Sequence, residues 1–169
     1  GNVIGGGDWA QDRLIPDLMR ALLAGRAVRV RNPDSIRPWQ HVLNPLSGYL
    51  ALAEALWSSA ELAGAWNFGP CDEDARPVRW IVWQIAASWP QQLSWLDGET
   101  QSRAGLHEAR YLKLDSSRAR SRLGWRPRWG LGEGLDATVA WYRALQAGEN
   151  MAAVTAAQID AYAQAVALA

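Results

Sequence analysis

The spacing of apolar residues in the first third of the chain predicts a helix, a strand and a second helix. Apolar residues at positions 14, 15, 18, 19 and 22 repeat at the helical period, and Gly25 can end that helix in the left-handed conformation. Val28–Arg31 alternates valine with arginine, which predicts a strand with both valines on one face, and Asn32–Ser35 is typical of a turn. A second helix is predicted from about Leu46 to Trp57, with a buried stripe made of Leu46, Tyr49, Leu50, Ala53, Leu56 and Trp57.

The remaining two thirds predict further helices separated by short strands. Ala65–Phe68 is expected to be a strand, and Leu93–Leu96 and Tyr111–Leu114 are strand candidates. Pro77 is expected to open a helix whose buried positions are Val78, Ile81, Val82, Ile85 and Trp89. A short helix capped by Asp115 or Ser116 and ended by Gly124 is expected next, then a longer one marked by Leu131, Leu135, Val139, Tyr142 and Leu145, and an alanine-rich terminal one from Thr155.

The order of these elements favours an α/β fold. Strands are few and scattered, which is typical of a piece of a larger sheet rather than of a complete doubly wound domain. Residues 2–4 read as the middle of a strand already under way, so we expect a C-terminal piece of a longer protein. Residues 150–169 are expected to form a helical extension beyond the compact part.

Composition narrows the classes of function. The 17 basic and 17 acidic residues cancel, whereas a protein that neutralises nucleic-acid phosphates usually carries a net basic surface, so no nucleic-acid partner is expected. The single cysteine, Cys71, excludes an internal disulfide and fits a reducing compartment. No apolar run approaches the roughly 20 residues of a membrane-spanning helix, so a cytoplasmic protein without membrane contact is expected.

Three motifs of cofactor or metal sites are weak. Gly5–Ala10 satisfies G-x-G-x-x-A, but the next helix starts only after Arg13, so an ordinary glycine loop near a ligand is the better interpretation. Asp72–Asp74 has no further spaced oxygen ligands, which favours a solvated loop. His41 and His107 are too far apart to be a helical metal pair, and no metal site is expected.

A cationic and aromatic stretch carries more information. Arginines stand at 29, 31 and 37, and the last is followed by Trp39 and His41. We interpret the segment around Arg37 as a loop that clamps an anion, because a guanidinium can hold a phosphate by two parallel hydrogen bonds. An arginine that merely covers Trp39 explains the same residues.

Six segments, in this order along the chain, resemble a known family: GNVIGGGDW, RLIPDLMRALLAG, VRNPDSIRPWQHVLNPLSGYL, GAWNFGP, HEARYLKLDSSRAR and LGWRPRW. They are similar to the CDP-glucose 4,6-dehydratases, which are extended short-chain dehydrogenases/reductases. The resemblance implies the last strands of a Rossmann-type parallel sheet together with a small mixed α/β domain that binds the nucleotide sugar. This chain departs from the family pattern at three places. Asn44 stands where an acid is expected, Leu106 where proline is expected, and Ser117-Arg118 where Ser-Lys is usual.

The resemblance also assigns roles to individual positions. It implies that Asn2 and Arg37 meet the diphosphate, with Trp39 and His41 flanking Arg37. The remaining substrate-binding positions that it implies are Arg13, Leu14 and Ile15 beside the nucleotide, Arg29, Val30 and Arg31 beside the base, and His107 and Glu108 over the ribose and phosphates.

The residues that would perform catalysis are expected outside this chain. The family uses a Tyr-x-x-x-Lys pair, whereas Lys113 is the sole lysine here and position 109 is alanine. The resemblance therefore implies the CDP-sugar-binding half of an NAD-dependent lyase, with NAD held mainly by the other half, and a homo-oligomer as the full-length protein. Two alternatives stay open at this point, namely a related nucleotide-sugar epimerase or decarboxylase and a non-catalytic nucleotide-sugar-binding module.

Overall fold

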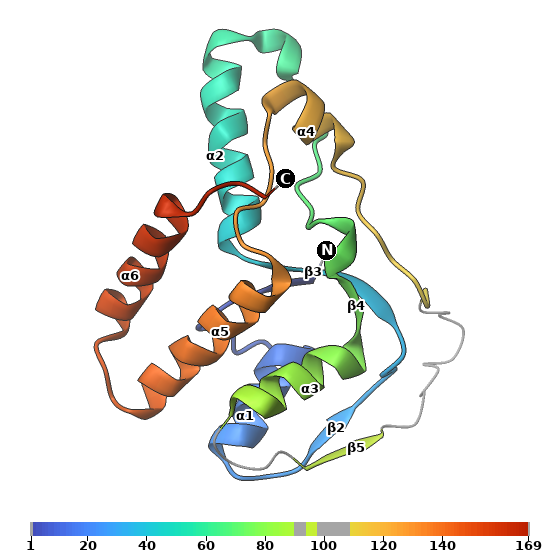
Figure 1. The fold of residues 1–169 in the computed structure, drawn as a ribbon, viewed down its shortest axis with the longest axis vertical. Helices are drawn as coiled ribbons and strands as arrows, with labels where there is room; N and C mark the ends of the chain where they lie inside the picture. Colours follow the sequence, from blue (N-terminus) through green and yellow to red (C-terminus); the bar gives the residue numbers. More distant parts are fainter. Residues whose placement is uncertain (1, 90–93, 98–108, 169) are drawn as a thin grey trace.

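The computed structural model describes residues 2–89, 94–97 and 109–168 and confirms an α/β fold (Figure 1). Its elements are β1 (Asn2–Ile4), α1 (Leu14–Leu23), β2 (Val28–Val30), β3 (Ile36–His41), α2 (Leu43–Ser58), η1 (Ala60–Leu62), η2 (Asp72–Asp74), β4 (Ala75–Pro77), α3 (Val78–Ser88), β5 (Trp95–Asp97), α4 (Ser117–Leu123), α5 (Leu131–Gln146) and α6 (Met151–Gln164). Across these described ranges, no helix is both long enough and apolar enough to span a bilayer.

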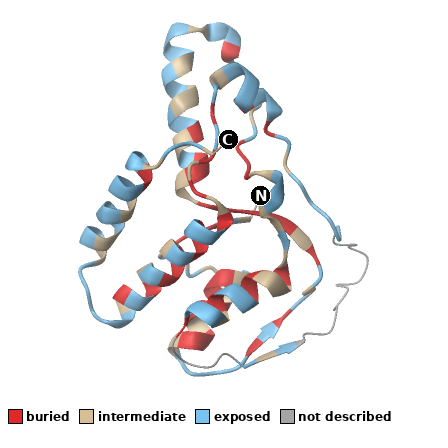
Figure 2. Ribbon diagram, viewed as in Figure 1, coloured by how far each residue is buried: buried red, intermediate tan, exposed pale blue. Residues whose placement is uncertain are grey.

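The strands form two small sheets. In the first, β3 lies in the middle, parallel to β1 and antiparallel to β4. In the second, β2 pairs in parallel with β5. Figure 1 shows α3 in front of α1, and the apolar residues of α3 and α5 form one core with β1, β3, α1 and β2 (Figure 2).

Several helices begin and end where the sequence predicts. α1 starts at Leu14 and is followed by Gly25 with a φ of +60°, and α4 ends at Gly124 with a φ of +61°. In α3 the predicted apolar positions are buried, as are Leu135, Val139 and Tyr142 in α5. These predictions succeed because a long helix with one buried face is the clearest local pattern in a sequence.

The stripe predicted to be buried on α2 is exposed, which corrects the sequence analysis. The helix starts at Leu43, and its buried residues are Asn44, Pro45 and Gly48, on the side opposite the stripe. Leu50 is 73% exposed and Trp57 94% exposed. Figure 2 shows the same helix projecting with little buried surface along most of its length.

The strand expected at residues 65–68 is not formed. Within the described chain this segment has no regular secondary structure and pairs with no strand, whereas Ala75–Pro77, not expected as a strand, pairs with β3. Trp95 and Leu96 are in β5, Leu93 lies outside the described residues, and Tyr111 makes only an isolated bridge with Ile36.

The terminal helix packs on the body of the protein rather than lying beyond it. α6 begins at Met151, earlier than predicted, because the Asn150 side chain accepts hydrogen bonds from two backbone N–H groups of the first turn. Gln158 donates to the Ala137 carbonyl of α5, and the Tyr162 side chain is buried. Only the relation of α6 to segments outside this chain stays a prediction.

Candidate functional site

Arg37 lies on a strand and not in a loop, which corrects the sequence interpretation. It belongs to β3, where β1 on one side and β4 on the other fix the backbone. Its side chain is 5% exposed, and Nη1 donates to the Ile36 carbonyl over 2.8 Å. A strand held on both sides positions a guanidinium more rigidly than a loop does, because the backbone cannot follow the side chain.

The register of the first sheet brings Asn2 to the same face as Arg37. Asn2 is opposite Trp39 in the parallel pair, and Trp39 and Arg37 are two residues apart on β3. Because side chains alternate between faces along a strand, Asn2, Arg37 and Trp39 share one face. The structure thus groups Asn2 and Arg37, to which the resemblance assigns the diphosphate, with Trp39, which it places beside Arg37.

Arg76 joins this face, although the sequence analysis did not single it out. In the antiparallel ladder Arg37 is directly opposite Arg76, so the two guanidinium groups extend from neighbouring positions. Facing positions of a ladder carry their side chains on the same face of the sheet, so this face holds two arginines. The Arg76 side chain is exposed and lies over the Trp80 ring at 5.4 Å, while its carbonyl accepts from Trp39 Nε1 at 2.9 Å.

His41 is a structural residue of the same strand rather than a further cation. It is 2% exposed, its ring lies 5.1 Å from that of Trp129, and Nδ1 accepts weakly from the Leu43 N–H at 3.4 Å. Burial away from water lowers the pKa of His41 to about 4, which keeps the imidazole neutral at physiological pH. It therefore adds no positive charge to the Arg37 face.

A second group of predicted residues gathers around the loop before α1. Arg31 donates to the Asp12 carbonyl over 3.2 Å and reaches the Asp12 carboxylate at 3.4 Å. Arg13 forms a 3.5 Å ion pair with Asp8 and precedes the half-buried Leu14. Arg13 and Arg31 are thus neighbours on the surface, with side chains about half to two thirds exposed.

Other predicted positions are core residues or lie elsewhere. Ile15 and Val30 are buried in the main core, so they can support a ligand site only by positioning their neighbours. Arg29 is exposed on the face of β2 opposite the valines. His107 and Glu108 lie outside the described residues.

The glycine loop is explained by packing. A Cβ atom on Gly6 would lie 2.1 Å from Trp141, so the indole of α5 occupies the space that this glycine leaves. α1 starts only at Leu14, and no helix begins at the loop itself. The loop therefore lacks the helix start that a dinucleotide fingerprint needs.

The acidic segment Asp72–Asp74 also has structural partners. Lys113 lies 2.9 Å from Asp72, and Asp74 accepts from the Leu131 N–H at the start of α5. Desolvation is the main cause that raises the pKa of Asp74. In the described parts of the chain, no three potential ligand side chains are grouped so that they could hold a metal ion.

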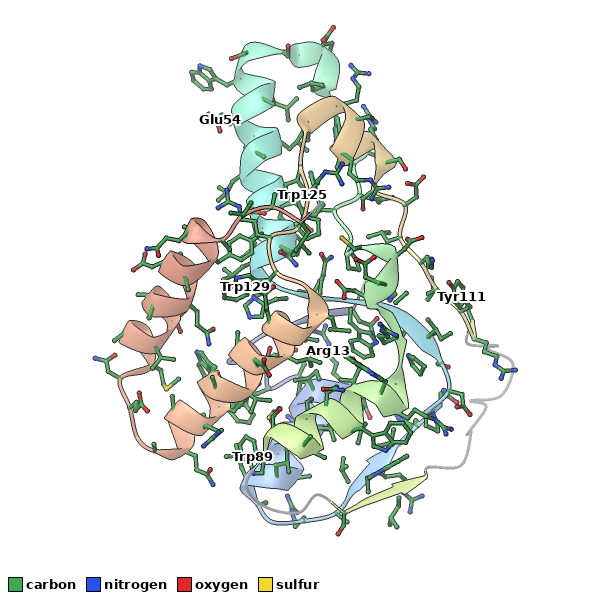
Figure 3. The ribbon with its side chains drawn as sticks, in the orientation of Figure 1. Arg13, Glu54, Trp89, Tyr111, Trp125 and Trp129 are labelled. Atoms are coloured by element: carbon green, nitrogen blue, oxygen red, sulfur yellow. The ribbon has the colours of Figure 1, made fainter. Side chains whose placement is uncertain are left out.

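The departure at Asn44 is explained by a hydrogen-bond network. Its Nδ2 donates to the Trp129 carbonyl over 2.8 Å, and its Oδ1 accepts from the Arg128 N–H, the Trp129 N–H and the Tyr162 hydroxyl. An amide can make all four contacts, whereas a carboxylate cannot donate to the carbonyl. Figure 3 shows Trp125 and Trp129 beside the foot of α2, where Trp125 Nε1 donates to Ser47.

The fold is that of nucleotide-sugar epimerases and dehydratases that work with NAD. UDP-glucuronic acid 4-epimerase from Bacillus cereus, solved with UDP-glucuronic acid and NAD, matches with a TM-score of 0.70 at 17% identity over 85% of this chain and 43% of that chain. dTDP-glucose 4,6-dehydratase from Bacillus anthracis, solved with NAD, matches with a TM-score of 0.62 at 17% identity over 84% and 42%. At this identity the likeness defines the class of fold.

Sequence comparison is more specific. The chain is 52% identical over 167 residues to CDP-glucose 4,6-dehydratase from Salmonella typhimurium, which is 98% of this chain and 45% of that protein. It is 31% identical over 137 residues to dTDP-glucose 4,6-dehydratase from an Actinoplanes species, covering 79% and 39%. No family model matches. The chain is thus a homologue of the CDP-glucose 4,6-dehydratases over slightly less than half of their length, which confirms the resemblance seen in the motifs.

Proposed function

We propose that this chain is the substrate-binding part of an NAD-dependent CDP-glucose 4,6-dehydratase. The observation that carries the proposal is the pair Arg37 and Arg76, opposite each other across the β3–β4 ladder, with Asn2 on the same face. A diphosphate carries its charge on several oxygens, which suits two arginines at facing positions of a ladder better than one. The 52% identity to the Salmonella enzyme supports the choice of CDP-glucose as substrate.

In the proposed reaction CDP-glucose becomes CDP-4-keto-6-deoxyglucose and water. The chemistry that NAD supplies when bound is reversible hydride transfer, so that C4 is oxidised first and C6 is reduced after water has left across C5 and C6. This chain would contribute binding and orientation. Arg37 and Arg76 would offset the diphosphate charge, and the resulting binding energy would fix the hexose at the cofactor.

In this proposal the catalytic pair and most of the cofactor site lie outside this chain. Lys113, the sole lysine, interacts with Asp72, and position 109 is alanine, so no Tyr-x-x-x-Lys pair exists. The glycine loop is filled by Trp141. In this proposal NAD therefore binds mainly to polypeptide that the relatives have in addition, and the complete protein acts in the cytoplasm as a homo-oligomer.

Substitution of Arg37 tests the proposal. In the complete enzyme, Arg37→Ala is expected to weaken CDP-glucose binding about 10- to 100-fold, because charge-assisted hydrogen bonds to the diphosphate are lost. NAD affinity should change little. Isothermal titration with CDP-glucose, CDP and NAD measures both effects, and Arg76→Ala should weaken the same nucleotide-sugar binding.

Arg122→Ala, which removes an exposed guanidinium of α4, is the matched control and should alter neither affinity. Equal loss of CDP-glucose and NAD binding on Arg37→Ala, or loss of neither, contradicts the assignment. Titration with UDP and dTDP sugars tests the base preference. Analysis of the product separates a dehydratase from an epimerase or decarboxylase, since only the dehydratase releases a 4-keto-6-deoxy sugar.

A further inference from the structure

The turn that joins β2 to β3, residues 32–35, is attached to the first turn of α3. The Val78 N–H donates to the Ser35 carbonyl over 3.0 Å, and the Arg79 N–H donates to the Pro33 carbonyl over 2.8 Å. The first N–H groups of a helix have no partner within the helix, so the two carbonyls satisfy donors that need one. α3 therefore fixes the backbone of the turn at two points.

A side-chain ion pair adds a third point of attachment. The Arg79 guanidinium contacts the Asp34 carboxylate, and the Arg79 side chain is 37% exposed. Arg79 Nε is buried and has no hydrogen-bond partner among the described residues. Asp34 therefore balances the charge of a guanidinium that is partly withdrawn from water, which gives this pair more weight than a fully exposed one.

The turn itself has an uncommon backbone conformation. Asn32 has a φ of +46°, a region that residues with a side chain adopt rarely, and the Ser35 N–H donates to the Asn32 carbonyl over 3.0 Å. Ser35 is buried. A backbone in such a region keeps its shape when its surroundings hold it, and here α3 supplies that restraint.

The turn lies between two parts of the candidate site. The resemblance places Arg29 and Arg31, before the turn, beside the base, and the proposed function places Arg37, after the turn, at the diphosphate. The Arg37 guanidinium also donates to the carbonyl of Ile36, the residue that separates it from the turn. A shift of the turn therefore changes the position of Arg37 relative to β2.

We propose that Asp34 and Arg79 are positioning residues that set the spacing between the nucleotide-binding and diphosphate-binding parts of the site. This inference rests on the proposed function. A ligand that spans both parts binds more tightly when their spacing is fixed in advance, because the protein then loses less conformational entropy on binding. A ligand that occupies only the nucleotide-binding part gains nothing from that spacing.

The test compares ligands with and without a diphosphate in the complete enzyme. Arg79→Gln and Asp34→Asn are each expected to weaken the binding of CDP and CDP-glucose about 3- to 5-fold, the effect of losing a partly exposed ion pair. The affinity of cytidine, which has no phosphate, should stay unchanged. Isothermal titration measures CDP and CDP-glucose, and displacement of CDP measures cytidine.

The double variant Asp34→Asn/Arg79→Gln should lose no more affinity for CDP than either single variant, because each change removes the same pair. Arg79→Lys, which keeps the charge, should recover part of the loss. Asp72→Asn is the matched control, since it breaks the ion pair between Asp72 and Lys113, whose lysine is exposed to a similar extent. It should leave the affinities for CDP and cytidine unchanged.

Two results would overturn the positioning role while Arg37→Ala still weakens CDP binding. One is an unchanged CDP affinity in Arg79→Gln and Asp34→Asn. The other is an equal loss of CDP and cytidine binding, which indicates a general loosening of the site. If Arg37→Ala itself leaves CDP binding intact, the proposed diphosphate site is refuted and the positioning role with it, so the two failures are distinguishable.

Discussion

The buried imidazole of His41 makes the free energy of unfolding depend on pH. Its Nε2 has no hydrogen-bond partner among the described residues, and burial lowers the pKa of His41 from 6.5 to about 4. The unfolded chain therefore binds a proton more readily than the folded one between these two values. The stabilising effect of the neutral imidazole is fully present above pH 6.5 and is lost as the pH falls towards 4.

We expect the free energy of unfolding to fall by about 3 kcal/mol between pH 6.5 and pH 4 through His41 alone, because each pKa unit corresponds to about 1.4 kcal/mol. Urea denaturation at a series of pH values measures this slope. His41→Gln should flatten it in that window, whereas His107→Gln, which changes the other histidine, should leave it in place. An unchanged slope in His41→Gln would show that other groups cause it.

The sequence pointed to some residues of the candidate site and missed others. Arg37 was found because its neighbours form a recognisable motif, and Asn2 because the resemblance points to it. Arg76 was missed, because its importance comes from the register between β3 and a three-residue strand, and no local pattern fixes such a pairing. The prediction of a loop around Arg37 was wrong for the same reason. This segment is a strand because it pairs with β1 and β4, and no local pattern reveals those pairings.

At the level of elements, α2 and α6 meet through a hydrogen-bond network around the Asn44 amide. Asn44 and Ser47 of α2 both contact the Tyr162 hydroxyl, at 3.0 Å and 2.9 Å, and Tyr162 also packs edge to face on Trp129. These contacts attach a helix that has few other buried side chains. The network explains how an alanine-rich helix of weak amphipathic character stays on the body of the protein.

Asn44→Asp is expected to destabilise the 169-residue chain by about 1–3 kcal/mol at pH 7, because the Trp129 carbonyl loses its donor inside the protein. Chemical denaturation measures the loss. Asn67→Asp, which removes an equivalent 3.1 Å contact to the Asp115 carbonyl at the surface, should lose much less. The effect at position 44 should shrink in acid, where a protonated carboxyl can donate again. Equal losses at both positions would contradict the network.

The periodicity of α2 predicted a helix correctly but gave the wrong side as buried. Apolar spacing identifies the helix but not which of its sides the described elements cover, and here they cover the side of Asn44, Pro45 and Gly48. The strand predicted at residues 65–68 rested on four residues, of which Trp66 and Phe68 favour strands while Ala65 and Asn67 do not. α1, α3 and α5 were predicted well because the elements that cover them are in this chain.

At the scale of the whole molecule, we expect substrate binding and catalysis to depend on different parts of the protein. We expect the purified 169-residue chain to form no 4-keto-6-deoxy sugar from CDP-glucose and NAD, because it has no tyrosine–lysine pair to remove the hydroxyl proton. Mass spectrometry of the reaction mixture, which detects the loss of one water from the sugar nucleotide, provides the measurement. The positive control is a full-length chimera, in which these residues replace the matching 45% of the Salmonella CDP-glucose 4,6-dehydratase. Turnover by the purified chain itself would show that other residues can act as the base.

The continuity of β3 and α2 links the strand of Arg37 to the helix that follows it. A single residue, Val42, separates the strand that carries Arg37 from the helix whose outer side is exposed. The chain has no loop there to absorb movement, and the Val42 N–H is itself bonded to the Ile4 carbonyl over 2.8 Å. A displacement of β3 along its axis is therefore also a displacement of the first turn of α2. If Arg37 binds the diphosphate as proposed, any shift of β3 on binding would therefore also move the first turn of α2.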